Sequence, residues 1–255
     1  MPRAVRGLIG LLAFGVVWEA AVAAGLLPAR FLPPPSVVLA GVVELFAQDA
    51  FLRDVVATVL AWAIALGVAV AVAVPAGLVL GGVPGVRAAS RVLVEFLRPI
   101  PSVALIPLVV LLVGGGPEAK ITLAVYAATW PVLYNTLYAV GGIDPVLRDT
   151  ARTCGAGPLR TMLAVALPHA APSVFTGVRM AAAIALIVVV STEFLAGASR
   201  GIGNVVLTAS SGAGRSDLVL AATLAAGAVG ILINEGLERL GERLFGRSTR
   251  SAEPV

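Results

Sequence analysis

Few side chains in this chain could carry out acid–base, nucleophilic or metal chemistry. There is one histidine, His169, one cysteine, Cys154, and one lysine, Lys120. A His-Glu-x-x-His zinc site needs two histidines, and a phosphate-binding loop needs a lysine after glycine, whereas Lys120 follows alanine. The Gly-Ala-Ser sequence that ends at Ser199 lacks the glycine that completes a Gly-x-Ser-Gly nucleophile site. We therefore expect a non-catalytic chain with no cofactor and no metal of its own.

The chemistry that the sequence does offer is docking to another protein, through a polar segment between two long apolar stretches. This segment reads Asp-Thr-Ala-Arg-Thr-Cys-Gly and runs from Asp149 to Gly155. Asp144 precedes a proline and predicts a turn, with its side chain as the N-cap of a short helix from Val146 to Thr153. Gly155 would let the chain turn sharply or let another backbone approach closely.

A second short helix is predicted from Leu159 to Leu167, and Pro168 would help to end it. Two short helices that meet at a glycine form a rigid projection, which can fit a groove on a soluble partner. The alternative is an ordinary amphipathic connector that lies on the membrane surface. The residue types alone leave both interpretations open.

The composition assigns most of the chain to a membrane. Of the 255 residues, 59% are hydrophobic and 13% are charged, and the mean hydropathy is +1.00. Soluble domains are about half apolar and about a quarter charged. We therefore expect an all-α membrane protein with little chain left for a soluble domain. The pI near 10.0 does not indicate nucleic acid, because the basic residues are scattered without a basic-aromatic cluster.

Apolar runs of about 20 residues predict about six transmembrane helices. The expected spans are Leu8–Leu27, Val55–Gly82 broken by Pro75, Val92–Val113 with three prolines, Ala119–Val140, Ala170–Leu195 and Leu218–Leu237. The first run also imitates a signal peptide, although it continues past its Ala-Val-Ala sequence. Six spans put both termini on one side. Basic residues are in excess on that side, with Lys120 counted in an outer loop, so we expect cytoplasmic termini and a cytoplasmic 144–168 loop.

The expected layout has four parts. Residues 1–32 form the first transmembrane helix and the start of an outer loop. Residues 33–52 form an extracytoplasmic amphipathic segment, in which Ser36 can cap a short helix after three prolines. Residues 53–240 form a core of five transmembrane helices that includes the loop at 144–168, and residues 241–255 form a cytoplasmic tail.

Polar side chains inside the spans are costly and need a partner or water. Four of them are candidates for a translocation path or a gate: Arg98, Arg179, Glu193 and Asn135. Arg98 can also form a structural ion pair with Glu95, three residues earlier on the same helix. Arg179 and Glu193 would be roughly 21 Å apart at about 1.5 Å per residue, so each must look elsewhere for a partner. Asn135 is expected to hydrogen-bond to a neighbouring helix.

The polar segment resembles the EAA loop of ATP-binding-cassette importer permeases, in which an acidic residue, a small residue and alanine are followed by glycine and later by an aliphatic residue and Leu-Pro. The matching residues are Asp149, Thr150, Ala151, Gly155, Val165, Leu167 and Pro168. Glutamate and alanine are usual at the first two positions, where this chain keeps a charge and a small side chain.

The resemblance extends over roughly Pro33 to Arg247. The proline-rich segment Leu97–Leu108, the Pro-Pro-Pro-Ser sequence that ends at Ser36, and Glu193 followed by Gly201-Ile202-Gly203 resemble permeases for aliphatic sulfonates, taurine and nitrate. It implies a type I, MetI-like importer bundle with cytoplasmic coupling helices in a bacterial plasma (inner) membrane.

The same resemblance implies the partners. They are a second copy of the chain, two ATPase subunits that bind ATP and Mg²⁺, and an extracytoplasmic binding protein that delivers sulfonate, taurine, nitrate or a similar small solute. Permeases for thiamine precursors look similar, which leaves the solute open. A secondary transporter or channel with no ATPase is the alternative function. A rhomboid-like protease is disfavoured because its nucleophile motif is missing.

Overall fold

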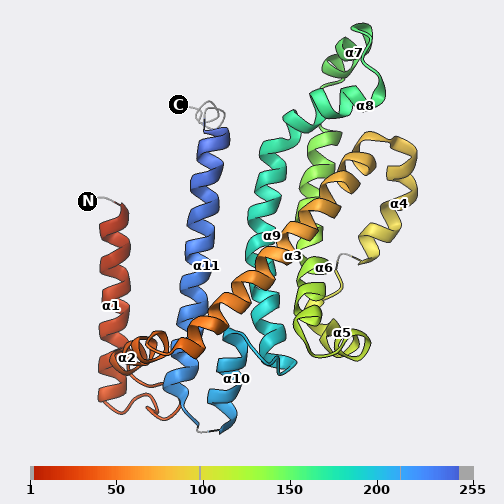
Figure 1. Cartoon of the computed structure of the whole chain (residues 1–255). Helices are drawn as coiled ribbons and strands as arrows, with labels where there is room; N and C mark the ends of the chain where they lie inside the picture. The colour runs from red at the N-terminus through yellow and green to blue at the C-terminus, as the bar shows by residue number, and fades with distance from the viewer. Residues whose placement is uncertain (1–2, 98, 213, 247–255) are drawn as a thin grey trace.

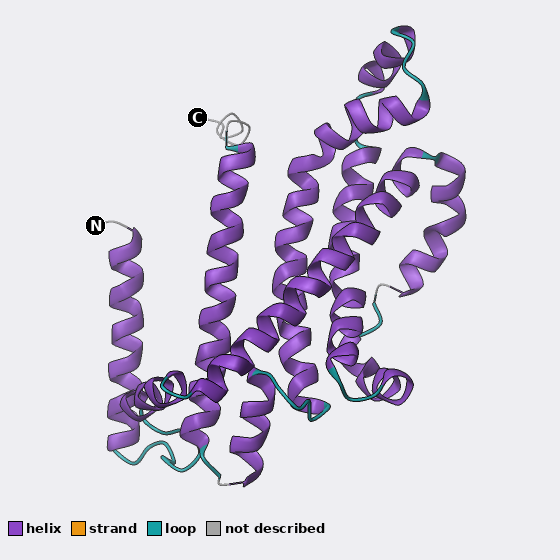
Figure 2. Cartoon of the chain, in the orientation of Figure 1, coloured by secondary structure: helices purple, strands orange, loops and turns teal. Residues whose placement is uncertain are grey.

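The protein is described by a computed structural model over residues 3–97, 99–212 and 214–246, and these residues form helices joined by short loops (Figures 1 and 2). The elements are α1 (Arg3–Ala23), α2 (Pro35–Phe46), α3 (Asp49–Gly82), α4 (Pro84–Leu97), the 3-10 helix Ser102–Leu105, α5 (Ile106–Val113), α6 (Pro117–Gly141), α7 (Pro145–Thr153), α8 (Pro158–Thr161), the π-helix Met162–Ala166, α9 (Leu167–Leu195), α10 (Ile202–Gly212) and α11 (Ser216–Phe245). The predicted all-α fold is confirmed.

Helices α3, α6 and α9 form the centre of the bundle, and small side chains make their contacts. The buried small residues are Ala61, Ala65, Ala69 and Ala73 on α3, Ala124 and Ala128 on α6, and Ala181, Ala182 and Ala185 on α9. The four alanines of α3 are spaced four residues apart, so their side chains lie on one continuous face of that helix. Small residues let helix backbones approach closely in a membrane, so that the indole of Trp62 donates to the carbonyl of Ala182 across 2.9 Å.

Among the described residues, four helical stretches are long and apolar enough to cross a membrane: Val5–Ala23, Asp49–Gly82, Pro158–Leu195 and Ser216–Phe245. Helix α6 has 25 residues, or about 37 Å at about 1.5 Å per residue, which is also sufficient to cross. Helix α3 continues through Pro75, contrary to the predicted break, because neighbouring helices allow a proline inside a membrane helix.

The third expected span, Val92–Val113, is not one helix. The chain leaves α4 at Leu97, forms a 3-10 helix and then runs into α5, which ends at Val113. Proline removes a backbone donor and restricts the residue before it. Prolines at 99, 101 and 107 therefore divide the run, and Figure 1 shows α4 and α5 at the edge of the bundle as separate segments.

The two ends of the bundle carry different structures (Figure 1). The described ends of the chain, at the start of α1 and the end of α11, lie toward the end that carries α7 and α8. Helices α2 and α10 lie at the opposite end. Both described ends of the chain therefore lie at the same end of the bundle.

Helix α2 is held by residues of other elements. Ser36 does not cap it, contrary to the prediction: the N-cap is Pro34, and the Ser36 hydroxyl and backbone N–H donate to the Glu19 carboxylate across 2.7 and 3.1 Å. Arg215 lies 2.7 Å from Asp217 and 3.3 Å from Glu44 of α2. The hydrogen bond to Asp217 raises the pKa of Arg215, so this cation stays charged and ties α2 to the start of α11.

Candidate functional site

Three places in the chain combine polar groups with an unusual position. The first is a projection at one end of the bundle, residues 144–161, which we call the arm. The second is a buried group of side chains at the opposite end, and the third is a cavity between α9 and α11. The structure separates the predicted site residues among these three places.

The arm projects beyond the ends of α3, α6 and α9 (Figure 1), and no residue of α7 is buried. Its base is attached through an apolar cluster that contains Leu78, Val140 and Ala166, with Leu167 packed against it. Asp144 caps α7 as predicted, because its side chain accepts a hydrogen bond from the Val146 N–H across 2.9 Å. The arm is thus anchored at its base, where Arg148 of α7 also donates to the carbonyl of Val140 of α6.

Helix α7 ends in a Schellman motif. The Gly155 N–H donates to the carbonyl of Arg152, and the Ala156 N–H donates to the carbonyl of Ala151, both across 2.9 Å. Gly155 has a φ of 77°, and a Cβ there would meet nothing within 4 Å. The motif needs a left-handed residue at this position, so backbone conformation rather than crowding within this chain requires the glycine. The spacing from Ala151 to Gly155 is the spacing of this motif.

The second half of the arm differs from the prediction. Helix α8 covers Pro158–Thr161, and the chain continues through the π-helix directly into α9. Pro168 therefore does not end a short helix but lies in the first turn of α9, where a missing N–H is tolerated. Val165 lies half-buried within the π-helix. The continuous helical path from Pro158 to Leu195 joins the arm rigidly to the centre of the bundle.

The arm presents an exposed apolar surface with charges beside it. Its exposed apolar side chains are Val146, Leu147 and Leu159, with Leu163 just beyond. Asp149 and Arg152 lie 3.5 Å apart with 69% and 73% of their side chains exposed. The Thr150 hydroxyl donates to the Val146 carbonyl across 2.8 Å within α7. Nothing in the described chain covers this surface, and exposed apolar patches with polar rims are typical of protein contacts.

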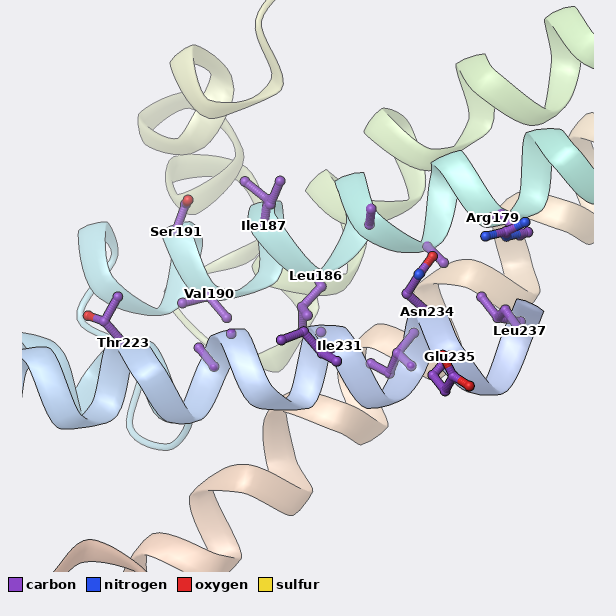
Figure 3. A pocket seen from close by; sticks show the side chains of 16 residues that line it. Arg179, Leu186, Ile187, Val190, Ser191, Thr223, Ile231, Asn234, Glu235 and Leu237 are labelled. Carbon is purple, nitrogen blue, oxygen red and sulfur yellow. The ribbon is translucent and has the colours of Figure 1, made fainter. Parts of the chain in front are cut away.

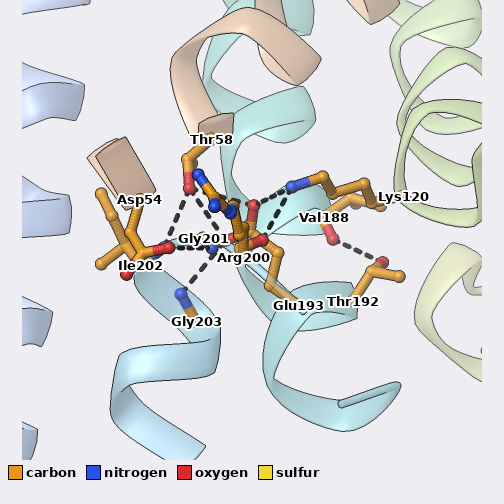
Figure 4. A network of polar contacts seen from close by, with 10 residues as sticks. All are labelled: Asp54, Thr58, Lys120, Val188, Thr192, Glu193, Arg200, Gly201, Ile202 and Gly203. Atoms are coloured by element: carbon orange, nitrogen blue, oxygen red, sulfur yellow. Dashed lines mark hydrogen bonds and ion pairs between the residues drawn. The ribbon is translucent and has the colours of Figure 1, made fainter. Parts of the chain in front are cut away.

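At the opposite end, an ion pair is completely enclosed by helices (Figure 4). The Lys120 Nζ lies 2.6 Å from the Glu193 Oε1, and their side chains are 4% and 0% exposed. The Thr58 hydroxyl, from α3, also donates to the Glu193 carboxylate across 2.9 Å. Lys120 makes a second hydrogen bond, 3.1 Å long, to the carbonyl of Arg200. This pair, together with Thr58, joins α3, α6 and α9.

The same group caps the start of α10. The Gly201 N–H donates to the Asp54 carboxylate across 3.0 Å, and the Ile202 N–H donates to the Thr58 hydroxyl across 3.0 Å. The Gly203 N–H donates to the Glu193 Oε2 across 3.1 Å. The first N–H groups of a helix have no partner within the helix; here side chains of two other helices accept them. We call Asp54, Thr58, Lys120 and Glu193 the buried cluster.

Gly201 is needed for this fit. It has a φ of 137°, and a Cβ there would lie 2.1 Å from the Glu193 Cδ. A side chain at this position would both strain the backbone and collide with the carboxylate. Glu193 and the Gly-Ile-Gly sequence, which the sequence analysis singled out, therefore form one structural unit. In this unit Gly201 leaves room for the Glu193 carboxylate to reach the start of α10.

Lys120 lies at the start of the expected span Ala119–Val140, where its charge was counted with the outer loops and no role was predicted for it. The structure buries it inside the first turns of α6. Pro117, at the first helical positions, supports this burial, because proline marks a helix start and Lys120 follows within the first turn. Its partner Glu193 is 73 positions away, so no local pattern could identify the pair.

The third place is a cavity of about 600 Å³ between α9 and α11 (Figure 3). Its lining is mostly apolar, with Arg179 and Glu235 toward one end and Ser191 and Thr223 toward the other. Arg179 lies 2.9 Å from Glu238 of α11, with 37% and 48% of the two side chains exposed. Arg179 thus finds a partner on another helix.

Asn135, another predicted path residue, does not line this cavity. The Asn135 side chain donates to the Pro131 carbonyl of its own helix across 2.8 Å, rather than to a neighbouring helix as expected. It lies where α6 meets Gly177 of α9. Arg98 lies outside the described residues, and so does its expected pairing with Glu95.

Comparisons with known proteins all point to one family of transport proteins. The family model for a binding-protein-dependent transport system inner membrane component matches residues 63–245. The taurine transport system permease protein of Escherichia coli is 31% identical over 250 residues, which cover 96% of this chain and 90% of that protein. A protein of Methanocaldococcus jannaschii named as an ABC transporter permease is 34% identical over 171 residues, 67% of this chain and 64% of its own length. Other relatives are named for aliphatic sulfonates, nitrate and bicarbonate.

Among solved structures, the methionine ABC transporter MetNI has a similar fold. One of its chains superposes with a TM-score of 0.66 at 18% sequence identity, over 76% of this chain and 95% of that chain. The MetI-like, all-helical fold predicted from the sequence is thereby confirmed.

Proposed function

The chain belongs to the family of binding-protein-dependent transport system inner membrane components, and we propose that it is the transmembrane permease subunit of an ATP-binding-cassette importer. In this proposal two copies of the chain form the translocation path. Two separate ATPase subunits bind ATP and Mg²⁺, and an extracytoplasmic binding protein delivers the solute. The chain itself contributes no catalytic residue and no cofactor site.

The observation that carries the proposal is the arm. A soluble ATPase needs a rigid contact element that transmits its movement to the membrane helices. The Schellman turn at Gly155 fixes α7 against α8, and the continuous path from Pro158 to Leu195 connects this corner to α9. The exposed leucines and valine of the arm supply the apolar contact, while Asp149 and Arg152 form part of its rim.

The remaining residues of the predicted loop hold the arm in place. Ala151 provides the carbonyl that closes the turn, and Thr150 caps a carbonyl within α7. Leu167 anchors the base in the apolar cluster, whereas Val165 and Pro168 lie where the π-helix passes into α9. Movement of the arm would therefore be transmitted to α9.

We assign the arm end to the cytoplasm and the α2 and α10 end to the outer side. One requirement of the proposal and one observation support this orientation. The arm must face the ATPase, and both described chain ends lie on the same side as the arm (Figure 1), with an excess of basic residues on that side. The binding protein would then meet α2 and α10.

The solute path is proposed to include the cavity between α9 and α11. An ion pair that is partly exposed on two membrane helices cannot face lipid at low cost, so Arg179 and Glu238 need water or protein beside them. A cavity of about 600 Å³ is large enough for a small solute. With relatives named for taurine, sulfonates and nitrate, a small sulfonate, taurine, nitrate or similar solute is the proposed cargo. Asn135 would serve helix packing.

The direct test is purification of the complex. The tagged chain should co-purify with an ATPase, and the reconstituted complex should take up solute only with ATP and binding protein present. Uptake by the chain alone, driven by an ion gradient and without any ATPase, would instead identify a secondary transporter.

A further inference from the structure

We propose that the buried cluster is the outer gate of the transporter, a charge-dependent closure that opens during each transport cycle. The inference rests on the proposed transport function and adds the site at which the outer end is closed. It assigns a role to Asp54, Thr58 and Lys120, which no sequence motif indicated, and it gives Glu193 a specific partner.

The position of the cluster is the first argument. It joins α3, α6, α9 and the start of α10 at the outer end, and the Glu193 side chain is entirely buried there (Figure 4). A cavity of about 240 Å³, lined by Lys120, Ala61 and Arg200, adjoins it. The larger cavity between α9 and α11 begins at Val190 and Ser191, within one helical turn of Glu193. The cluster therefore lies next to both spaces that a solute could enter.

The chemistry of the cluster is the second argument. Burial of an ion pair costs desolvation, and well-packed apolar residues of similar volume are often as stable or more so. A purely static contact among α3, α6 and α9 would need only the small residues that continue along these helices. A charge pair adds a contact that is strong when complete and unfavourable when one partner is removed, so its formation and separation would distinguish a closed from an open arrangement.

The connection to α10 is the third argument. Three successive N–H groups, from Gly201 to Gly203, are accepted by Asp54, Thr58 and Glu193. Displacement of α10 would therefore break three hydrogen bonds together with the contacts of the carboxylate. A binding protein that contacts α10 from outside would act directly on the closure.

The gate is tested by thiol labelling of a buried residue that lines the cavity beside it. Ala61, which is 3% exposed and lines the smaller cavity, is replaced by Ala61→Cys in a Cys154→Ser background. A membrane-impermeant maleimide is added outside intact cells that express the whole complex. Ala221→Cys, at a fully buried position where the start of α11 packs against α2 at the outer end, reports any general loss of structure.

Removal of one charge should open the gate. Glu193→Gln and Lys120→Met should each raise the labelling rate of Ala61→Cys by at least about tenfold, because each leaves a buried group without its partner. The double variant should label more slowly than either single variant, since neither charge is then left unpaired. Glu19→Gln, which removes a carboxylate on α1 that contacts α2 at the same end, should have no effect, and Ala221→Cys should stay protected in both charge variants.

The transport cycle should open the gate in the unaltered cluster. Ala61→Cys should be labelled faster in energised cells than in ATP-depleted cells when taurine, ethanesulfonate and nitrate are supplied in turn. Labelling that stays equal in both conditions, and equal among the charge variants, would overturn the gate and leave a static contact. ATPase co-purification should remain normal in every variant, so failure of the gate is distinguishable from failure of the proposed function.

Discussion

The ammonium group of Lys120 lies 2.6 Å from the carboxylate of Glu193 at the end of the bundle opposite the arm, and both side chains are buried. This contact joins α6 to α9, the helix that continues at its other end into α8 of the arm. One helix thus connects the proposed ATPase contact with the proposed gate. A displacement of the arm would change the position of Glu193 without any intermediate flexible loop.

The fit at Gly201 predicts a large effect of a small substitution. Gly201→Ala should lower the free energy of unfolding by about 3 kcal/mol or more, because strain at a left-handed residue adds to a collision with Glu193. Gly67→Ala, on α3 with nothing within 4 Å of the added Cβ, should change it by no more than about 1 kcal/mol. Thermal unfolding of the two purified variants in detergent measures the difference; equal Tm values would contradict the described turn.

The proposed orientation predicts the reactivity of the native cysteine. Cys154 is exposed on the arm, and it is the single cysteine in the sequence. An impermeant maleimide should leave it unlabelled in intact cells and label it in inverted membrane vesicles. Ser210→Cys, on an exposed position of α10, should show the opposite pattern in a Cys154→Ser background. The reversed result for both residues would invert the topology.

Local patterns in the sequence were sufficient to predict the helical fold and much of the structure of the arm. Asp144 as a cap, Gly155 as a turn and the apolar runs all follow from rules that act over a few residues. The break in the third span was harder to foresee. Some prolines are tolerated within a membrane helix, as at Pro75, whereas others interrupt it, as between α4 and α5.

The candidate sites depend on contacts that are remote in the sequence. Glu193 gave a visible signal as a carboxylate in an apolar helix, but its partners come from α3 and α6. Arg179 likewise pairs with Glu238, 59 positions away. Such pairs are selected by packing of the whole bundle, so a single sequence indicates that a partner is needed without indicating which one.

The Arg179–Glu238 pair should matter more for transport than for stability. Each side chain is more than a third exposed, so Arg179→Gln should change the free energy of unfolding by less than about 1 kcal/mol. Uptake should fall by about fivefold or more if the pair lines the path. The reversed pair, Arg179→Glu with Glu238→Arg, should recover part of the loss. Uptake at the level of the unaltered protein in Arg179→Gln would remove this cavity from the path.

The rim of the arm should contribute modestly to docking. Asp149 is exposed and its pairing with Arg152 is long, so Asp149→Lys should leave the arm folded. Affinity for the ATPase should fall by about two- to fivefold, the size expected of a peripheral charge. Titration of the purified ATPase against the variant and the unaltered chain in detergent measures this change. A loss of all binding would mean that the charge lies at the centre of the contact.

The central claim is that the corner at Gly155 is pressed against an ATPase. Gly155→Trp adds a large side chain at this corner and strains a left-handed residue. Gly25→Trp is a matched control, because Gly25 has nearly the same φ, 73° against 77°, and equally open surroundings, but it lies after α1 at the opposite end of the molecule (Figure 1).

The most direct measurement is ATPase pull-down by these two variants after purification, with equal amounts of membrane-inserted chain. We expect Gly155→Trp to lose the ATPase, or to keep it without solute-stimulated hydrolysis, while Gly25→Trp retains normal binding and hydrolysis. Normal ATPase binding and normal ATP-driven uptake by Gly155→Trp would contradict the account and reduce the arm to a connector.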